Sequence, residues 1–272
     1  MRDPDIFFTP VPDRVLAEMF RIAAITSDDT VLDLGSGDGR IVITAARDWS
    51  ARGIGIDIDP TRIAESLANA ARAGVSDCVE FRQQDFLEAC LSEATLITLY
   101  LLDSLNIRLR PKILSECAPG TRIVSYSFEM GEWEADAHTP IAANGVFLWI
   151  VPANLSGVWS TADESTTGGI EALHIVQTFQ ILSGDLRYRG MSWDIHEARA
   201  TGERFTLKAK SSHSAESLFI TGQIHGETID GFMTHAGIET PILLNREPAI
   251  SGNSGPTFTE TKPTNAGLST KV

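Results

Sequence analysis

The first half of the chain alternates between short apolar runs and amphipathic segments. The apolar runs have strand length and cover residues 30–34, 53–58, 78–82, 94–100 and 122–128. Short, continuously apolar runs of this kind are typical of strands that are buried on both faces of a sheet. The segments between them carry apolar residues at helical spacing, and the expected helices cover residues 13–24, 41–47, 61–72 and 107–117. Repeated alternation of strand and helix predicts an α/β domain with a Rossmann-like, doubly wound, mostly parallel sheet.

The pattern changes at Gly145. From there, short runs with alternating apolar and polar residues, such as the expected strand over residues 173–182, are separated by turn formers such as Ser183-Gly184-Asp185. Short strands with regular turn signals predict an antiparallel all-β domain, either a small barrel or a sandwich. We therefore expect an α/β domain over residues 1–144 and a β-domain over residues 145–245. The remainder, residues 246–272, is rich in Ser, Gly, Thr and Pro and is expected to be a disordered tail.

Composition narrows the range of partners. Of the 272 residues, 36 are acidic and 22 are basic, which gives a formal net charge of -14. Such a charge disfavours binding to nucleic-acid phosphates and to anionic membranes, and it favours basic or neutral substrates. No apolar run reaches membrane-crossing length, and the N-terminus lacks a basic start followed by an apolar run, so we expect a cytoplasmic protein.

Metal and disulfide chemistry find little support in the sequence. The three cysteines are odd in number and show no C-x-x-C spacing; they are Cys78, Cys90 and Cys117. Five of the six histidines fall in the second half, and none shows the spacing of a metal-ligand pair. We therefore expect no disulfide framework and no bound metal.

A glycine-rich turn follows the first predicted strand. Gly35, Gly37 and Gly39 alternate with polar residues and lead directly into an apolar helical segment. Glycine lets the backbone take unusual torsions and approach a ligand closely, and the free N–H groups that open the helix can hold a carboxylate or a phosphate. Strand, turn and helix together predict a nucleotide pocket, whereas a purely structural turn is the alternative.

Details of the turn favour one kind of nucleotide. A dinucleotide site would read G-x-G-x-x-G, but Arg40 occupies the position of the third glycine. Asp33 lies two residues before Gly35, where its negative charge would repel a pyrophosphate. The same charge suits the ammonium group of an amino-acid ligand, whose carboxylate can lie at the helix N-terminus beside Ser36 and Gly37.

The second strand ends in two acids with different expected roles. Asp57 lies near the distance from the glycines at which a Rossmann-type sheet places an acid against ribose hydroxyls. Asp59 precedes Pro60, so it is better explained as the N-cap of the next helix. Ile58, between them, is expected against the face of the adenine.

The turn resembles a known motif. The stretch Asp33-Leu34-Gly35-Ser36-Gly37-Asp38-Gly39 is similar to motif I of class I S-adenosylmethionine-dependent methyltransferases. Within that class, four further segments resemble the small protein-lysine methyltransferases of archaea, bacteria and mitochondria: Phe7-Phe8-Thr9-Pro10, Tyr100-Leu101-Leu102, Leu109-Arg110-Pro111-Lys112 and Pro119-Gly120-Thr121-Arg122. The resemblance covers residues 7 to 135.

The resemblance implies S-adenosyl-L-methionine as the cofactor. It implies further that Asp85, just past the third strand, accepts a hydrogen bond from the adenine amino group, with Phe86 beside it. Asp85 can equally be the N-cap of a helix expected over residues 87–91. The segment around Thr9 is expected either to pack on the core or to close over the pocket as a lid. The predicted cofactor-binding residues are Thr9, Asp33, Gly35, Ser36, Gly37, Asp57, Ile58, Asp85 and Phe86.

The methyl acceptor is expected at the end of the fourth strand. Ligands of open parallel sheets bind beyond the C-terminal strand ends, so Tyr100 and Asp103 should face the transferred methyl group. We predict both as catalytic residues, although Asp103 stands where the resemblance would place proline. Other candidates near this strand edge are Tyr126, Phe128, Glu129 and Trp133.

Three functions agree with these observations. The first is N-methylation of a protein lysine, and the second is methylation of a small molecule in a pocket that the β-domain caps. The third is a non-enzymatic module that only binds S-adenosylmethionine, because a fold alone does not establish catalysis. The sequence indicates neither the identity of the acceptor nor an oligomeric state.

Overall fold

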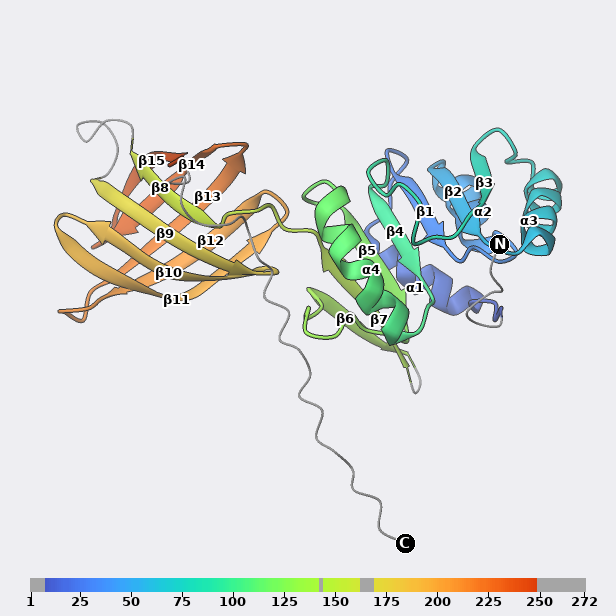
Figure 1. The fold of residues 1–272 in the computed structure, drawn as a ribbon, viewed down its shortest axis with the longest axis horizontal. Helices are drawn as coiled ribbons and strands as arrows, with labels where there is room; N and C mark the ends of the chain where they lie inside the picture. The colour runs from blue at the N-terminus through green and yellow to red at the C-terminus, as the bar shows by residue number, and fades with distance from the viewer. Residues whose placement is uncertain (1–7, 142–143, 162–168, 249–272) are drawn as a thin grey trace, which may run out of the picture.

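A computed structural model describes residues 8–141, 144–161 and 169–248, which form a sheet domain followed by a barrel (Figure 1). The sheet domain contains seven strands: β1 (Thr30–Leu34), β2 (Arg52–Asp57), β3 (Val79–Gln83), β4 (Leu96–Leu99), β5 (Arg122–Tyr126), β6 (Ala137–Ile141) and β7 (Asn144–Ile150). Its helices are α1 (Asp13–Ala23), α2 (Arg40–Trp49), α3 (Pro60–Ala73) and α4 (Asp103–Glu116).

The strand order of the sheet is β3-β2-β1-β4-β5-β7-β6. Strands β1 to β5 pair in parallel, whereas β7 pairs antiparallel with β5 and with β6. The order reverses between β1 and β4, and at such a point the carboxyl ends of neighbouring strands leave a crevice for ligands. The doubly wound, mostly parallel sheet is therefore confirmed.

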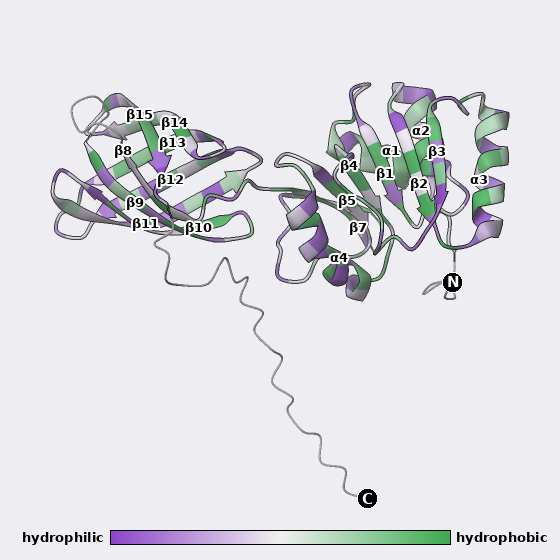
Figure 2. Ribbon diagram, turned by 45° about the horizontal axis from the view of Figure 1, so that its top comes forward, coloured by the Kyte–Doolittle hydropathy of each residue, from purple (hydrophilic) through white to green (hydrophobic). Residues whose placement is uncertain are grey.

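Helices cover both faces of the sheet. On one face, α1 and α2 pack on β1, β4 and β5 through a core that includes Val15, Phe20 and Val42. On the other face, α4 packs through Leu105, Leu109 and Ile113. Because both faces are covered, most residues of the central strands are apolar, and β1, β2 and β4 carry green stretches in Figure 2. Asp33 on β1 and Thr98 on β4 are buried polar exceptions.

The second domain is a closed antiparallel barrel in the order β10-β11-β12-β13-β14-β15-β8-β9. Its strands are β8 (Gly157–Thr161), β9 (Ile170–Thr178), β10 (Ile181–Tyr188), β11 (Met191–Thr201), β12 (Arg204–Ser211), β13 (Ser217–His225), β14 (Thr228–His235) and β15 (Ile238–Arg246). Alternate residues point inward; on β12 these are Phe205, Leu207 and Ala209. They join Trp159 and Trp193 in one apolar core that fills the barrel. Of the two expected all-β architectures, the structure is a barrel.

Several element boundaries differ from the expected ones. The expected start of the β-domain at residue 145 falls inside β7, which belongs to the first sheet. We therefore propose that the domains divide between Ile150 and Gly157. The expected strand over residues 173–182 is interrupted by a turn and forms parts of β9 and β10. Of the expected disordered tail, residues 249–272 lie outside the described part of the chain.

Candidate active site

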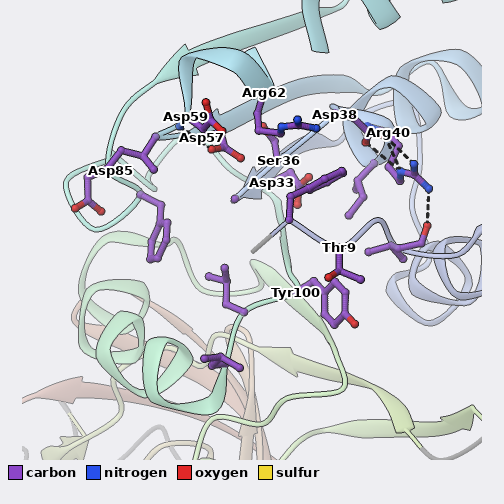
Figure 3. Close-up of a pocket in the computed structure, with 18 of the residues that line it drawn as sticks. Thr9, Asp33, Ser36, Asp38, Arg40, Asp57, Asp59, Arg62, Asp85 and Tyr100 are labelled. Carbon is purple, nitrogen blue, oxygen red and sulfur yellow. Dashed lines mark hydrogen bonds and ion pairs between the residues drawn. The ribbon is translucent and has the colours of Figure 1, made fainter. Parts of the chain in front are cut away.

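A cavity of about 580 Å³ lies at the carboxyl ends of the parallel strands. Its walls come from the segment before α1, the turns after β1 and β2, the segment after β3, and the ends of β4 and β5. The volume is within the usual range for a small-molecule site. Acidic groups occupy one end, where Asp57, Asp59 and Asp85 gather, and Tyr100 lies beside Thr9 at the other end (Figure 3).

The glycine turn forms the floor of the cavity. Gly37 and Gly39 have φ angles of 52° and 79°, in the left-handed region that favours glycine. A Cβ atom on Gly37 would lie 2.1 Å from the Phe8 ring, so the missing side chain lets this ring rest directly on the turn. Gly39 is also the N-cap of α2, and the opening turn of that helix carries no acidic side chain. The first N–H of α2, that of Arg40, donates to the Asp38 carboxylate at 3.2 Å, so an anionic ligand group would depend on the other N–H groups of the first turn.

Asp33 is a buried carboxylate below this turn. It is 3% exposed, and its Oδ1 accepts a hydrogen bond of 2.7 Å from the Thr98 hydroxyl on the neighbouring strand β4. Burial raises the pKa of Asp33 to about 7; the Thr98 hydrogen bond opposes this shift, and the carboxylates of Asp57 and Asp38 add to it. A buried acid with such a raised pKa favours the arrival of a cation that would restore its charge.

Asp57 and Asp59, at the end of β2, have different hydrogen-bonding roles. The Asp57 carboxylate accepts from the backbone N–H of Gly37 at 2.8 Å and from that of Asp59 at 2.9 Å. Each of its oxygens keeps a further lone pair, so the carboxylate can still accept hydroxyl groups from the cavity. Asp59 caps α3 by accepting from the Thr61 N–H at 2.7 Å, and Pro60 follows at the first helical position. The capping role predicted for Asp59 is therefore confirmed.

The residues predicted around an adenine are brought together. Ile58, Asp85 and Phe86 line the same end of the cavity. Asp85 also accepts from the Leu87 N–H at 2.9 Å, so it caps the segment that follows. The expected helix after Asp85 is replaced by turns.

The segment before α1 lies against the cavity. Phe8 and Thr9 both line it, whereas Phe7 lies outside the described residues. The Arg62 guanidinium lies 5.0 Å from the centre of the Phe8 ring, which is a cation–π distance. The segment therefore lines the pocket at Phe8 and Thr9 and packs on the core at Val11, while its closure as a lid stays a prediction.

Two arginines in this region were missed by the sequence reasoning. Arg40 pairs with Asp38, which is largely buried, and donates to the carbonyl of Val11 at 3.0 Å, so it ties the glycine turn to the N-terminal segment. Arg62 contacts Phe8 from α3. Neither position carries a sequence signal beyond an ordinary helix-surface arginine.

The opposite end of the cavity is aromatic. Tyr100, Leu101 and Leu102 continue from β4, and Phe128 follows β5. The ring centres of Tyr100 and Phe128 lie 6.1 Å apart, and Tyr126 lies 4.8 Å from Tyr100 on the far side of the wall. Burial raises the pKa of Tyr100, with a smaller contribution from Tyr126, so its phenol keeps its proton at neutral pH.

Two predicted site residues do not line the cavity. Gly37 lies beneath Phe8, where its N–H donates to Asp57, so it supports the floor from below. Asp103 is exposed on the first turn of α4, and its Oδ1 accepts from the Glu129 N–H at 2.8 Å. Its position therefore supports the loop after β5 and not the reacting groups.

Three further candidates also lie elsewhere. Tyr126 packs in the core between sheet and helices, and Glu129 is exposed beside the pocket. Trp133 is 1% exposed and stacks between Trp149 and Phe179, away from the cavity. The expectation that Trp133 belongs to the pocket is wrong, because the loop after β5 turns toward the barrel before it reaches this residue.

The donor set suits an amino acid joined to a nucleoside. Asp33 offers a buried negative charge, the α2 N-terminus offers N–H groups, and Asp57 accepts hydroxyl groups. The Ser36 hydroxyl is buried without a hydrogen-bond partner, so a polar ligand group would satisfy it. Among the described residues, no group of three or more His, Cys, Asp or Glu side chains is arranged to hold a metal ion. Within the same part of the chain, no helix is long and apolar enough to cross a bilayer.

Comparison with known proteins agrees with this donor set. A family model described as the ANTKMT methyltransferase domain matches residues 33–137, from the glycine turn to the start of β6. A protein-lysine N-methyltransferase of Saccharolobus islandicus is 43% identical over 131 residues, which are 48% of this chain and 81% of that protein. The adenine nucleotide translocase lysine N-methyltransferase of mouse is 30% identical over 42% of this chain, and the match spans only 48% of the mouse protein.

A solved structure shares the fold. The crystal structure of an RNA methyltransferase from Salinibacter ruber, in complex with S-adenosyl-L-homocysteine, is 47% identical and superimposes with a TM-score of 0.53. The match covers 54% of this chain and 96% of that one. The similarity extends over about half of the present chain, as expected if it is confined to the sheet domain.

Proposed function

Because this chain belongs to the class I S-adenosylmethionine-dependent methyltransferases, we propose that it transfers the methyl group of this cofactor to the side-chain amine of a protein lysine. The observation that carries the proposal is the 43% identity to a protein-lysine N-methyltransferase over 81% of that enzyme's length. Two mouse relatives are also named for lysine methylation, although the present chain spans only about half of each of them.

The donors of the cavity suggest an orientation for the cofactor. We assign the ammonium group to Asp33 and the carboxylate to the Ser36 hydroxyl and the first-turn N–H groups of α2, because the backbone N–H groups of Gly35, Ser36 and Gly37 already donate within the protein. The ribose hydroxyls would then meet Asp57, and the adenine would lie between Ile58 and Phe86, with its amino group toward Asp85. Thr9 would cover the cofactor from the N-terminal segment.

This orientation directs the reacting methyl group toward the aromatic end of the cavity. S-adenosylmethionine would supply a methyl carbon bound to a positively charged sulfur: the lone pair of the lysine nitrogen would form the new N–C bond in line as the C–S bond breaks, and neutral S-adenosylhomocysteine would leave. Tyr100 and Phe128 would hold the lysine side chain beside it, since aromatic faces attract an arriving ammonium and an apolar wall favours its neutral form. Positioning of this kind can supply much of the rate.

Tyr100 would act as a wall and hydrogen-bonding group and not as a base. Its raised pKa keeps the phenol protonated at neutral pH, so it has no negative charge with which to accept the lysine proton. The amine would lose its proton to water on the way into the apolar end. Asp103 would contribute as a positioning residue, through its hydrogen bond to the Glu129 N–H.

A closed pocket for a small molecule is less consistent with the structure. That alternative depends on the β-domain covering the cavity, but every residue that lines it comes from the segment between Phe8 and Phe128. In Figure 1 the barrel lies on the side of α4 and β6, and α3 lies at the opposite end of the sheet. Leu102, which lines the cavity beside Tyr100, is 44% exposed, and such an exposed wall suits a side chain presented by another protein.

RNA is the second candidate acceptor. The Salinibacter ruber relative, which is named as an RNA methyltransferase and is 47% identical, favours it. The balance of 36 acidic to 22 basic residues disfavours it, because RNA binding depends on Lys and Arg contacts to phosphates. We therefore rank protein lysine above RNA.

One experiment separates the candidates. The purified protein is incubated with tritiated S-adenosylmethionine and size-fractionated cell lysate, and each labelled fraction is then treated with protease or with ribonuclease. We expect label in protein that protease releases as methylated lysine after full hydrolysis. Label that ribonuclease releases, or label only in small molecules, would contradict the proposal. Absence of label together with normal cofactor binding would favour a non-enzymatic module.

A further inference from the structure

The loop that follows β5 connects the pocket to the barrel. It covers residues 127–136, and we refer to it as the β5 loop. Phe128, near its start, lines the aromatic end of the cavity. Trp133 and Asp136, near its end, contact side chains of the barrel. A shift at the barrel end can therefore be transmitted to the pocket wall along a short stretch of chain.

Helix α4 holds the first part of the β5 loop. Asp103 accepts from the Glu129 N–H at 2.8 Å, and Arg110 donates to the Met130 carbonyl at 2.9 Å. Between them, the Asn106 amide makes longer contacts of 3.4 Å with two carbonyl groups of the same loop. Residues 103, 106 and 110 follow helical spacing, so these three side chains project from one face of α4.

The barrel holds the second part. At the β9–β10 turn, the Phe179 ring stacks on Trp133 with ring centres 5.9 Å apart and planes inclined by 16°. Beside it, the Gln180 side chain donates to the Glu134 carbonyl at 2.7 Å. Arg199 of β11 pairs with Asp136 at 2.5 Å. The barrel thus contacts three successive parts of the loop: Trp133 by ring stacking, Glu134 by a hydrogen bond and Asp136 by an ion pair.

Arg110 links the two sets of contacts. While one of its nitrogens donates to the Met130 carbonyl, its guanidinium lies 5.0 Å from the centre of the Phe179 ring. The same arginine therefore contacts both the β5 loop and the barrel turn. Loss of the Phe179 ring would remove one side of its packing.

The conformation of the turn indicates that these contacts are specific. Phe179 has a φ of 54°, which is unfavourable for a bulky residue and persists where surrounding contacts compensate. Gln180 is 1% exposed, so its amide would lose its hydrogen-bond partner if the loop moved away. Both residues are suited to a turn that is docked on the loop, and both would destabilise the β9–β10 hairpin if it stood free of the loop.

We propose that the barrel acts as a buttress: its Phe179–Gln180 turn fixes the β5 loop and so sets the position of Phe128 in the wall that receives the methyl acceptor. The role of this wall in receiving the methyl acceptor rests on the proposed methyl transfer, whereas the mechanical link between barrel and loop does not. Phe179 is a positioning residue in this scheme, because it acts on the pocket only through the loop. Displacement of a wall by about 1 Å is enough to slow an oriented transfer severely.

The test uses the full chain with Phe179→Ala. We expect faster amide hydrogen exchange across residues 127–136, and a fall of about tenfold in kcat/KM for the acceptor. The Kd for S-adenosylmethionine should stay unchanged, because the acidic end of the cavity does not touch the loop. Phe179→Tyr keeps the ring and should restore both values.

A matched control lies on the same barrel. Phe232 on β14 is 50% exposed on the outer face, and Phe232→Ala should change neither exchange in the β5 loop nor transfer. Arg199→Ala is a milder second variant that removes only the ion pair to Asp136, and it guards against a Phe179→Ala protein that fails to fold.

Two outcomes would overturn the inference. Unchanged exchange across residues 127–136 in both Phe179→Ala and Arg199→Ala would show that the barrel does not hold the loop. Faster exchange with unchanged acceptor kinetics would show that Phe128 does not depend on it. The exchange measurement needs no methyl acceptor, so it decides the mechanical link even if the wild-type protein labels no lysine.

Discussion

The two ends of the cavity are built by different means. At the acidic end, the groups that face a ligand lie in the last residues of β1 and β2 or in the turns that directly follow, so their positions follow from the strands that carry them. At the aromatic end, Phe128 sits on a loop that α4 and the barrel hold from two sides. The acidic end is thus local in sequence, whereas the aromatic end depends on tertiary contacts over long separations.

This difference indicates which end of the cavity can tolerate changes in sequence. Contacts within one strand–turn–helix unit form together with the sheet and tolerate little variation. A wall supported by a second domain can be repositioned by changes far from the reacting atoms. We therefore expect variants at the acidic end to alter cofactor affinity, and variants at the aromatic end to alter turnover at normal cofactor affinity.

The largest effect is expected from Asp33→Asn. Removal of the buried charge leaves a ligand ammonium unpaired, so affinity for S-adenosylmethionine should fall by roughly 100- to 1,000-fold. Isothermal titration calorimetry measures the change. A loss of affinity below tenfold would mean that the ammonium binds elsewhere. It would also contradict the assignment of cofactor binding to the acidic end.

A smaller effect is expected at the aromatic end. Tyr100→Ala should lower kcat by about 10- to 100-fold with little change in the Kd for S-adenosylmethionine, because an open wall no longer orients the acceptor. Tyr100→Phe keeps the ring and should retain most of the activity. Single-turnover assays with both variants decide the role of the phenol. If Tyr100→Phe were as slow as Tyr100→Ala, the hydroxyl would be chemically required.

The ionisation of Asp33 predicts a pH effect on stability. Its pKa in the folded protein is about 7, above the ordinary value of 3.8, so the folded state keeps a proton that the unfolded state releases. The protonated Asp33 side chain makes its whole contribution to folding stability below about pH 4, and this contribution is lost as the pH rises through about 7. Ligand-free wild-type protein should therefore lose about 5 °C in Tm relative to Asp33→Asn between these pH values.

Scanning calorimetry across this pH range measures the difference between the two proteins, and other carboxyl groups cancel in the comparison. Saturating cofactor should remove the pH effect, because a bound ammonium stabilises the charged form. Parallel Tm curves for the ligand-free proteins would contradict the raised pKa.

The smallest effect separates the two acids after β2. Asp59→Ala removes the N-cap of α3 and should lower the free energy of unfolding slightly. Affinity for S-adenosylmethionine should stay within twofold, because the Asp59 carboxylate is engaged by the Thr61 N–H. Denaturant titration and calorimetry supply the two readouts. A large loss of affinity would move Asp59 into the ligand-binding set.

The acidic end could be predicted because its groups lie close together in sequence. The residues from Asp33 to Gly39 form one turn, and Asp57 follows the next strand, so strand order alone brings them into contact. Of the predicted cofactor-binding residues, all but Gly37 line the cavity. The sequence could not predict that Phe8 contacts Gly37 or that Arg62 contacts Phe8, since both contacts depend on how the N-terminal segment folds back.

The aromatic end was less predictable for a physical reason. Asp103 was expected in a loop because the predicted helix began at residue 107, but α4 begins four residues earlier and turns its carboxylate toward the β5 loop. Phe179 gave no turn signal, because a left-handed turn position is normally marked by glycine. The run 173–182 therefore looked like one strand, and the residue that docks the barrel remained hidden within it.

The closure of the barrel has a consequence for biosynthesis. Its first strand, β8, pairs with its last, β15, so the ring cannot be completed until Arg246 has left the ribosome. The sheet, by contrast, has all its strands once Ile150 has emerged. The N-terminal half of the nascent polypeptide can thus assemble while β8, paired with β9 on one edge, still lacks β15 on the other, and pairing of such sequence-distant strands is slow. Over that interval the open barrel would present two additional strand edges to a chaperone.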